Sequence, residues 1–134
     1  MREYAKFAVE KTLELLAIDS PTGFTHMVDD YVEKEFQNLG FATKRCNKGG
    51  IIIDLGGEDV NDGLLLQAHA DTLGGMVAEI KSNGRLRMTN LGGMNANNIE
   101  GENCRVYTMK GDVYEGTFQL CNASLHVNPN YSAT

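Results

Sequence analysis

A histidine and an aspartate two residues apart follow a run of leucines near the middle of the chain, in the segment Gly63-Leu-Leu-Leu-Gln-Ala-His-Ala-Asp71. The leucines predict a short strand over Leu64–Gln67 that is buried on both faces. In open α/β sheets, reactive groups gather at the carboxyl ends of such strands. Because residues i and i+2 of a strand project to the same side, His69 could offer an imidazole nitrogen to a metal ion. Asp71 would then lie close enough to act catalytically by orienting that ligand.

The His-x-Asp spacing has an ordinary explanation as well. By chance it occurs in roughly one chain in six of this composition, and a histidine at a strand end is more often a polar terminus. The residues that follow fit a site nevertheless. Thr72 is expected to hydrogen-bond the backbone, and Gly74 and Gly75 would let the chain turn sharply where a side chain would crowd the site.

Four other polar residues are weaker candidates. His126 is expected to be a solvated loop histidine, with a place in a neighbouring subunit's cleft as the alternative. His26 has no partner in the pattern. Glu100 and Glu102 could meet a substrate amino group, although acidic loop residues are usually solvated.

Two helices are expected before the leucine run. The first has one apolar stripe, formed by Ala5, Val9, Leu13 and Leu16. Asp19-Ser-Pro-Thr-Gly23 ends that helix, because proline and glycine do not continue it. Thr25 is the expected N-cap of the second helix and Gly40 its C-terminal cap. The second buried face comprises Val28, Tyr31, Val32, Phe36 and Leu39.

Strand patterns follow Gly40. Residues 41–46 alternate, and Ile51–Leu55 is a β-branched run between glycine doublets. Together with Leu64–Gln67, these segments predict strands that feed one sheet, which is the start of an α/β layer. The glycine doublets form neither a dinucleotide-binding motif nor a P-loop, so they are interpreted as tight turns.

Beyond Asp71 the pattern is entirely β. Residues 76–81 and 85–88 flank Asn83-Gly84, which favours a two-residue hairpin turn. Residues 104–109 and 113–120 flank Lys110-Gly-Asp112 in the same manner. Short strands with glycine punctuation suggest a small barrel or sandwich. We therefore expect a domain boundary near residue 72, which gives an α/β part over residues 1–72 and a β part over residues 73–134.

Composition limits the function classes. The 134 residues carry a formal net charge of −6, with 42% hydrophobic and 22% charged residues. This predicts a globular chain and argues against nucleic acid or an anionic membrane as partner. There is no apolar run of about 18 residues and no secretory pattern at the N-terminus. The three cysteines, Cys46, Cys104 and Cys121, lack metal-binding spacing and fit reduced thiols in the cytoplasm.

Several motifs in order resemble one family. The stretch from Gln67 to Arg87, the following Asn90-Leu-Gly-Gly93, the upstream Ser20-Pro-Thr-Gly23 and the downstream Glu100-Gly-Glu-Asn-Cys104 with Val127 are similar to the dinuclear-metal aminopeptidases. That family includes glutamyl aminopeptidase and the tetrahedral, self-compartmentalising aminopeptidases, and some of its members carry an endoglucanase-like label. The similarity runs from about Leu13 to Val127.

The resemblance implies a fold, an activity and a limit. It implies the start of an α/β metallopeptidase catalytic domain followed by an inserted all-β, small-barrel dimerisation domain. It also implies hydrolysis of N-terminal residues from peptides by a cytoplasmic homo-oligomer that uses two divalent metal ions, zinc or cobalt. His69 would be a metal ligand and Asp71 a catalytic residue. The family's other ligands come later in its longer sequences, so this chain is expected to be an N-terminal portion that is inactive alone.

Two alternatives remain open at this point. The chain could be a non-catalytic oligomerisation or binding module whose β region pairs with a partner. It could also be an endoglucanase-like polysaccharide hydrolase, although the absence of Trp and an aromatic content of 7% disfavour sugar stacking.

Overall fold

The computed structural model describes residues 2–59, 61–120, 124 and 126–127. These residues divide into two compact units, one up to Gly92 and one from Gly93 onward. Each unit is described by itself. The first contains two helices and two hairpins, and the second contains one hairpin preceded by a short 3-10 helix, η1 (Ala96–Asn98).

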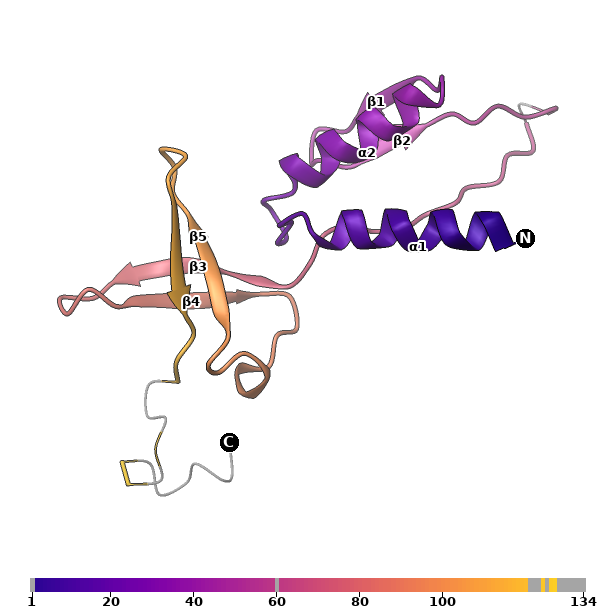
Figure 1. Ribbon diagram of the computed structural model, residues 1–134. Coiled ribbons are helices and arrows are strands. Elements are labelled where there is room, and N and C mark those ends of the chain that lie inside the picture. Colours follow the sequence, from indigo (N-terminus) through magenta and orange to yellow (C-terminus); the bar gives the residue numbers. More distant parts are fainter. Residues whose placement is uncertain (1, 60, 121–123, 125, 128–134) are drawn as a thin grey trace. The chain divides into compact units, whose positions relative to one another are not determined.

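Both predicted helices are confirmed. Helix α1 spans Arg2–Leu16 and α2 spans His26–Asn38 (Figure 1). Thr25 precedes α2 as predicted, but its hydroxyl donates to the Asp29 carboxylate at 2.9 Å instead of accepting a backbone N–H. Gly40 follows the helix with φ +89°, a left-handed conformation that suits glycine at a helix C-terminus. None of the helices described is long and apolar enough to cross a membrane.

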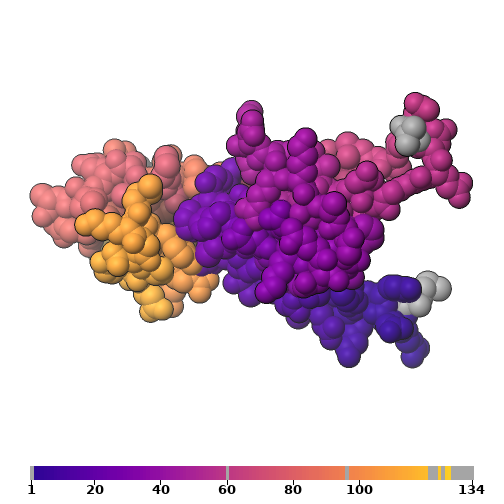
Figure 2. Space-filling view, turned by 90° about the horizontal axis from the view of Figure 1, so that it is seen from above, coloured from indigo at the N-terminus to yellow at the C-terminus, as the bar shows by residue number. Residues whose placement is uncertain are grey.

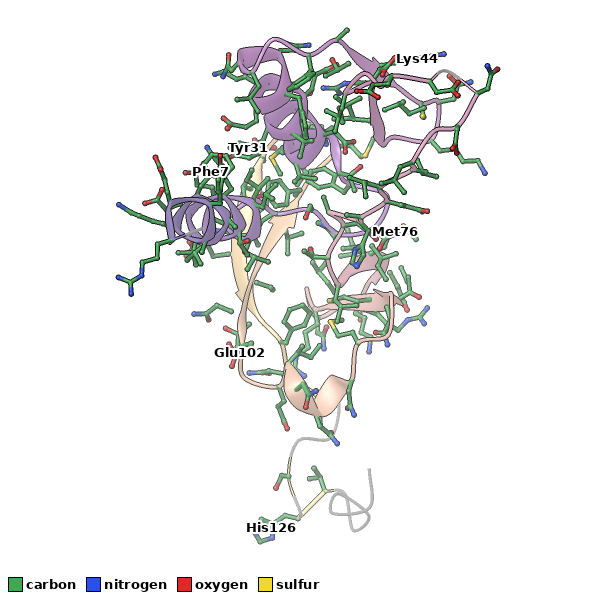
Figure 3. The ribbon with its side chains drawn as sticks, turned by 90° about the vertical axis from the view of Figure 1, so that its right-hand side faces the viewer. Phe7, Tyr31, Lys44, Met76, Glu102 and His126 are labelled. Atoms are coloured by element: carbon green, nitrogen blue, oxygen red, sulfur yellow. The ribbon has the colours of Figure 1, made fainter. Side chains whose placement is uncertain are left out.

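A polar cluster joins the two helices. Lys11 Nζ of α1 lies 2.8 Å from a carboxylate oxygen of Glu35 and 2.9 Å from one of Glu14. Hydrogen bonds to Glu35 first, and then to Glu14, raise the pKa of Lys11 above its ordinary value. The ammonium also lies 5.9 Å from the centre of the Phe7 ring and 5.7 Å from that of Tyr31, two side chains that lie next to each other in Figure 3. These partners hold the lysine charge between the helices.

The first hairpin packs on α2. Strands β1 (Thr43–Arg45) and β2 (Ile51–Ile53) are antiparallel and both contact that helix. The Arg45 guanidinium pairs with Glu33, at 2.8 Å from Nε, and with Asp30. The same guanidinium is the main cause that lowers the pKa of Glu33. The hairpin therefore attaches to the polar side of α2 by charge-assisted hydrogen bonds.

The other strands form two further antiparallel pairs. Strand β3 (Gly74–Ile80) pairs with β4 (Leu86–Leu91), and β5 (Asn103–Tyr107) pairs with β6 (Val113–Thr117). Both hairpins were predicted. The described strands make three separate two-stranded sheets, and the small barrel stays a prediction.

The hairpin turn at Asn83-Gly84 differs from the prediction. A two-residue turn of the expected type needs φ > 0 at both central residues, but among the described residues only glycines have positive φ. Here the Gly84 N–H donates to the Lys81 carbonyl at 2.9 Å, and the Lys81 N–H donates to the Arg85 carbonyl at 2.8 Å. This is a three-residue loop that ends in a left-handed glycine. The turns at Cys46–Gly50 and Thr108–Asp112 have the same pattern.

The prediction of a buried strand over Leu64–Gln67 is wrong for the chain as described. No strand is present there, and Leu64, Leu65 and Leu66 are 87%, 82% and 74% exposed. A strand needs hydrogen-bonding neighbours, and the connection from β2 to β3 is a long loop without a strand alongside it (Figure 1). In Figure 2, the pink atoms of this connection project beyond the purple atoms of α2 at the upper right.

The buried core is small. Among the described residues only Val28 of α2 and Ser20 are buried. The α1 stripe, predicted to be core, is exposed at all four of its positions. Of the predicted α2 face, Leu39 is exposed and the others are half-buried or buried. The apolar stripe of α1 is therefore in contact with solvent, whereas most of the α2 face is at least half-buried.

The two compact units divide after the β3–β4 hairpin, which clusters with the helices. The sequence predicted a boundary near residue 72, with residues 1–72 in one domain and 73–134 in the other. That boundary stays a prediction.

Replacing Gly84 with alanine should weaken the tip of the β3–β4 hairpin. The left-handed conformation at φ +80° costs a non-glycine residue roughly 1–2 kcal/mol. We expect the Lys81 amide to exchange with solvent about fivefold to thirtyfold faster, measured by NMR. Gly93→Ala is the matched control, because Gly93 has open space around it and no positive φ. Equal exchange in the two variants would contradict this account of the turn.

The exposed leucines should drive self-association. Three adjacent apolar side chains on an extended segment form an exposed apolar surface that favours association between chains. Leu65→Lys is therefore expected to lower the weight-average mass measured by sedimentation at a fixed concentration. Met109→Lys is the control, since Met109 is an exposed apolar residue at the tip of a turn. An equal change in both variants would show that the effect is one of net charge.

Candidate functional site

The loop between the helices holds the His-x-Asp segment in place. The Thr72 N–H donates to the Ser20 carbonyl at 2.8 Å, and the Thr22 N–H donates to the Thr72 carbonyl at 3.2 Å. Pro21, which has no N–H to donate, lies opposite Thr72 in this short parallel bridge. The buried Ser20 hydroxyl adds a third bond, to the Ala70 carbonyl at 3.0 Å. The site is thus built from two segments about fifty residues apart.

The Asp71 carboxylate links a threonine to the histidine. Its Oδ2 accepts a hydrogen bond from the Thr22 hydroxyl at 2.6 Å, and its Oδ1 lies 3.2 Å from His69 Nδ1. The pKa of Asp71 is lowered, first by the Thr22 hydroxyl and then by His69, while partial burial opposes the shift. Asp71 is therefore a carboxylate at neutral pH.

The contacts of His69 decide which ring nitrogen carries the proton. Nδ1 faces two acceptors, Asp71 Oδ1 at 3.2 Å and the Asp71 carbonyl oxygen at 3.1 Å. A neutral imidazole has one donor nitrogen and one acceptor nitrogen, so Nδ1 is assigned as the donor. Nε2 then presents its lone pair, and the His69 side chain is 85% exposed. This is the arrangement of a metal-ligating histidine whose second nitrogen bonds a carboxylate.

The described residues fit part of a metal site and no more. A catalytic zinc ion takes about three protein ligands. Nowhere in residues 2–59, 61–120, 124 and 126–127 do three or more His, Cys, Asp or Glu side chains group closely enough to hold a metal ion. His69 would supply one ligand and Asp71 its orientation.

The other predicted residues have separate surroundings. The Thr72 bonds given above are made by its main-chain N–H and carbonyl, and a backbone bond from its hydroxyl stays a prediction. A side chain at Gly74 would crowd Pro21, whose Cβ lies 2.5 Å from the ideal Cβ position. His26 packs edge-on against the Phe24 ring, with 4.6 Å between centroids.

Three further candidates belong to the second unit: His126, Glu100 and Glu102. His126 is exposed, as expected for a loop histidine, and is labelled in Figure 3. The Glu102 carbonyl accepts a hydrogen bond from the Phe118 N–H at 2.9 Å. Cys46 and Cys104 are free thiols, and Cys121 lies outside the described residues.

Sequence reasoning missed Ser20 and Thr22 as partners of the site. Their signal was two hydroxyl residues on either side of the proline that follows α1. Such a pattern normally indicates only a turn. The partner segment, Ala70–Thr72, is too distant in sequence for the pattern to specify.

Comparisons with known proteins place the chain among aminopeptidases. The sequence model of the M42 glutamyl aminopeptidase family matches residues 49–133. “Putative aminopeptidase YhfE” of Bacillus subtilis (strain 168) is 44% identical over 124 residues, which are 90% of this chain and 36% of that protein. “Glutamyl aminopeptidase” of Lactococcus lactis subsp. cremoris (strain MG1363) is 30% identical over 103 residues, 76% of this chain and 29% of that protein. The chain spans about a third of each relative's length.

Solved structures agree on the fold. A PhTET1-12s dodecamer superposes with a TM-score of 0.72 at 25% identity, over 81% of this chain and 32% of that one. The TET1 peptidase of Pyrococcus horikoshii gives a TM-score of 0.72 at 24% identity, over 83% of this chain and 32% of that one. Both matched chains are about three times as long as the part of them that superposes.

Removing the Thr22 hydroxyl should raise the pKa of Asp71. The pKa of Asp71 is lower in the folded loop than its ordinary value of 3.8, so the contact stabilises the loop fully at pH values above 3.8. This stabilisation is lost as the pH falls through the lower pKa of the folded loop. In Thr22→Val we expect the pKa to move up toward 3.8, measured from the carboxyl carbon by NMR titration. Thr25→Val removes a similar Thr–Asp bond elsewhere and should leave Asp71 unchanged. An unchanged Asp71 in Thr22→Val would refute the assignment.

The family match over residues 49–133 and the 44% identity over most of the chain lead to one assignment. This chain belongs to the M42 glutamyl aminopeptidase family and corresponds to about a third of its relatives' length.

Proposed function

We propose that this chain is the N-terminal portion of a cytoplasmic metallo-aminopeptidase that removes N-terminal residues from peptides. The observation that carries the proposal is the His69–Asp71 pair, in which a carboxylate bonds Nδ1 and leaves Nε2 exposed. Membership in an aminopeptidase family supports the reaction class. The activity is proposed for the complete protein, because this chain covers 36% of its Bacillus subtilis relative.

Two divalent cations, zinc or cobalt, are proposed as the cofactors of the complete protein. When bound, such ions polarise a scissile carbonyl and lower the pKa of water, which supplies a nucleophile at neutral pH. Within this chain His69 would bind one ion through Nε2. Asp71 would be the catalytic residue that holds the imidazole in the required tautomer.

We propose that the chain alone is inactive. A two-metal site needs several carboxylate and imidazole ligands that converge on both ions. The described residues provide one imidazole with its carboxylate partner and no cluster of three ligands. The remaining ligands would come from sequence outside the matched third.

We also propose a homo-oligomer in which the β region, residues 73–134, forms a small-barrel insert that mediates dimerisation. Of the two solved structures, one is a dodecamer and the other is of a peptidase that can assemble into a tetrahedron or a large octahedral shell. Among the described residues, the β3–β4 hairpin and the β5–β6 hairpin each form a two-stranded sheet, and a further strand can add to the edge of such a sheet. The two curated relatives reported above are named aminopeptidases, which favours this reaction over the endoglucanase-like alternative.

A chimera tests the proposed function. In it this chain replaces the matched segment of the Bacillus subtilis relative, and release of the N-terminal residue from peptides is assayed with zinc or cobalt. We expect activity in the chimera, none from the 134-residue chain, and a loss of at least about a hundredfold in His69→Ala. His26→Ala should retain activity, because His26 contacts a phenylalanine ring. The unsubstituted relative is the positive control.

Metal content provides the second arm of that test. The chain is equilibrated with zinc or cobalt, freed of excess ion and analysed. At most one weakly held ion, lost in His69→Ala, is expected. Two tightly held ions per chain would contradict a partial site, and full activity of a His69→Ala chimera would contradict the assignment of His69.

A further inference from the structure

We propose that Thr22 is a positioning residue of this site: it holds one oxygen of Asp71, leaves the other for His69, and thereby fixes Nε2 as the nitrogen offered to a metal ion. This inference rests on the proposed function for its metal, but not for its geometry. Thr22 lies outside the His-x-Asp motif, on the loop between α1 and α2. The Asp71 carboxylate links it to His69 by two hydrogen bonds.

The relative lengths of the two hydrogen bonds show which partner orients the carboxylate. The Thr22 hydroxyl lies 2.6 Å from Oδ2, a length typical of a strong O–H···O⁻ bond. Nδ1 of His69 lies 3.2 Å from Oδ1, near the long end of the range for N–H···O bonds. The His69 ring is also largely exposed. The threonine therefore restrains the carboxylate more strongly than the histidine does.

Thr22 can act as a fixed donor because its own N–H and the two residues before it are held in place. Its own N–H bonds the Thr72 carbonyl, and Pro21 before it has a restricted φ. One residue further back, the buried Ser20 bonds Ala70 and Thr72. A β-branched side chain also has few χ1 rotamers. The hydroxyl thus comes from a rigid segment that is bonded directly to the segment carrying Asp71.

A competing restraint must be separated from this one. The Asp71 carbonyl oxygen lies 3.1 Å from Nδ1, and it could by itself keep the proton there. If it did, loss of the Thr22 hydroxyl would leave the imidazole tautomer unchanged. If Thr22 acts through the carboxylate, its loss lets the carboxylate rotate, and both tautomers become populated.

The deciding measurement is the tautomer of His69 in the metal-free 134-residue chain. Ring nitrogen shifts of ¹⁵N-histidine-labelled protein are recorded at about pH 8, above the ordinary histidine pKa of about 6.5, with His69→Ala to assign the signals. The native chain should show Nδ1 protonated. In Thr22→Val the ratio of the Nδ1-protonated to the Nε2-protonated form of His69 should fall at least about threefold. Thr22→Ser, which keeps the hydroxyl, should have the native ratio.

Thr25→Val is the matched control, because it removes the same kind of Thr–Asp bond, at 2.9 Å, beside Asp29. It should leave the His69 tautomer as in the native chain. Amide spectra report whether each variant is folded, and Thr22→Ala, which also removes the hydroxyl, takes the place of Thr22→Val if that variant is unfolded. An unchanged tautomer in folded Thr22→Val, or a Thr22→Ser variant that differs from the native chain, would overturn the proposal.

Cobalt(II) ions then connect the tautomer to metal binding. Paramagnetic broadening of the His69 ring signals is measured against cobalt concentration, with His26 as an internal reference. In Thr22→Val the concentration for half-maximal broadening should rise about tenfold, in the range known for loss of a partner behind a metal ligand. Failure of cobalt to broaden His69 in the native chain would count against the proposed metal function. The tautomer ratio would still decide the role of Thr22.

Discussion

The parallel pairing of residues 20–22 with Thr72 is the contact on which the rest of the first unit depends. It joins the end of α1 to the start of β3, and it encloses α2 and the first hairpin between its two ends. The Ser20 hydroxyl is buried there, so its hydrogen bond to Ala70 satisfies a group that would otherwise be costly to desolvate. The Asp71 side chain bonds Thr22 within this pairing and His69 three residues before Thr72.

Local parts of the fold were predictable because their causes are local. The apolar stripe, the proline after Ser20 and the glycine after Leu39 suffice to place α1 and α2. Glycine-containing turns likewise placed the hairpins. The type of each loop depended on which residue has positive φ. The pair Asn83-Gly84 did not show whether Asn83 would share that conformation with Gly84.

Long-range features were harder. The contact between His69 and Asp71 joins residues two apart in sequence. It was predicted from the periodicity of a strand, although no strand forms there. The Thr22–Asp71 contact spans 49 residues and had no local cause. The leucines at 64–66 failed as a prediction because burial of a strand depends on its neighbours, and no strand among the described residues pairs with them. A sequence pattern states what a segment requires, and the surrounding chain decides whether the requirement is met.

The repeated hairpin loop has a consequence for the order of folding. In each hairpin described, one left-handed glycine closes a loop of three residues, so the hairpins can form while the chain is being synthesised. Bringing Ser20 to Ala70 instead closes a loop of 50 residues, for which chain entropy alone amounts to roughly 3.5 kcal/mol plus a constant. The Asp71 carboxylate would therefore acquire its Thr22 partner late, because the hairpin at 43–53 lies inside that loop and is synthesised before it closes. Until that loop closes, the His69 side chain of a nascent chain would lack its fixed orientation. The segment would therefore be synthesised some time before it could bind a metal ion.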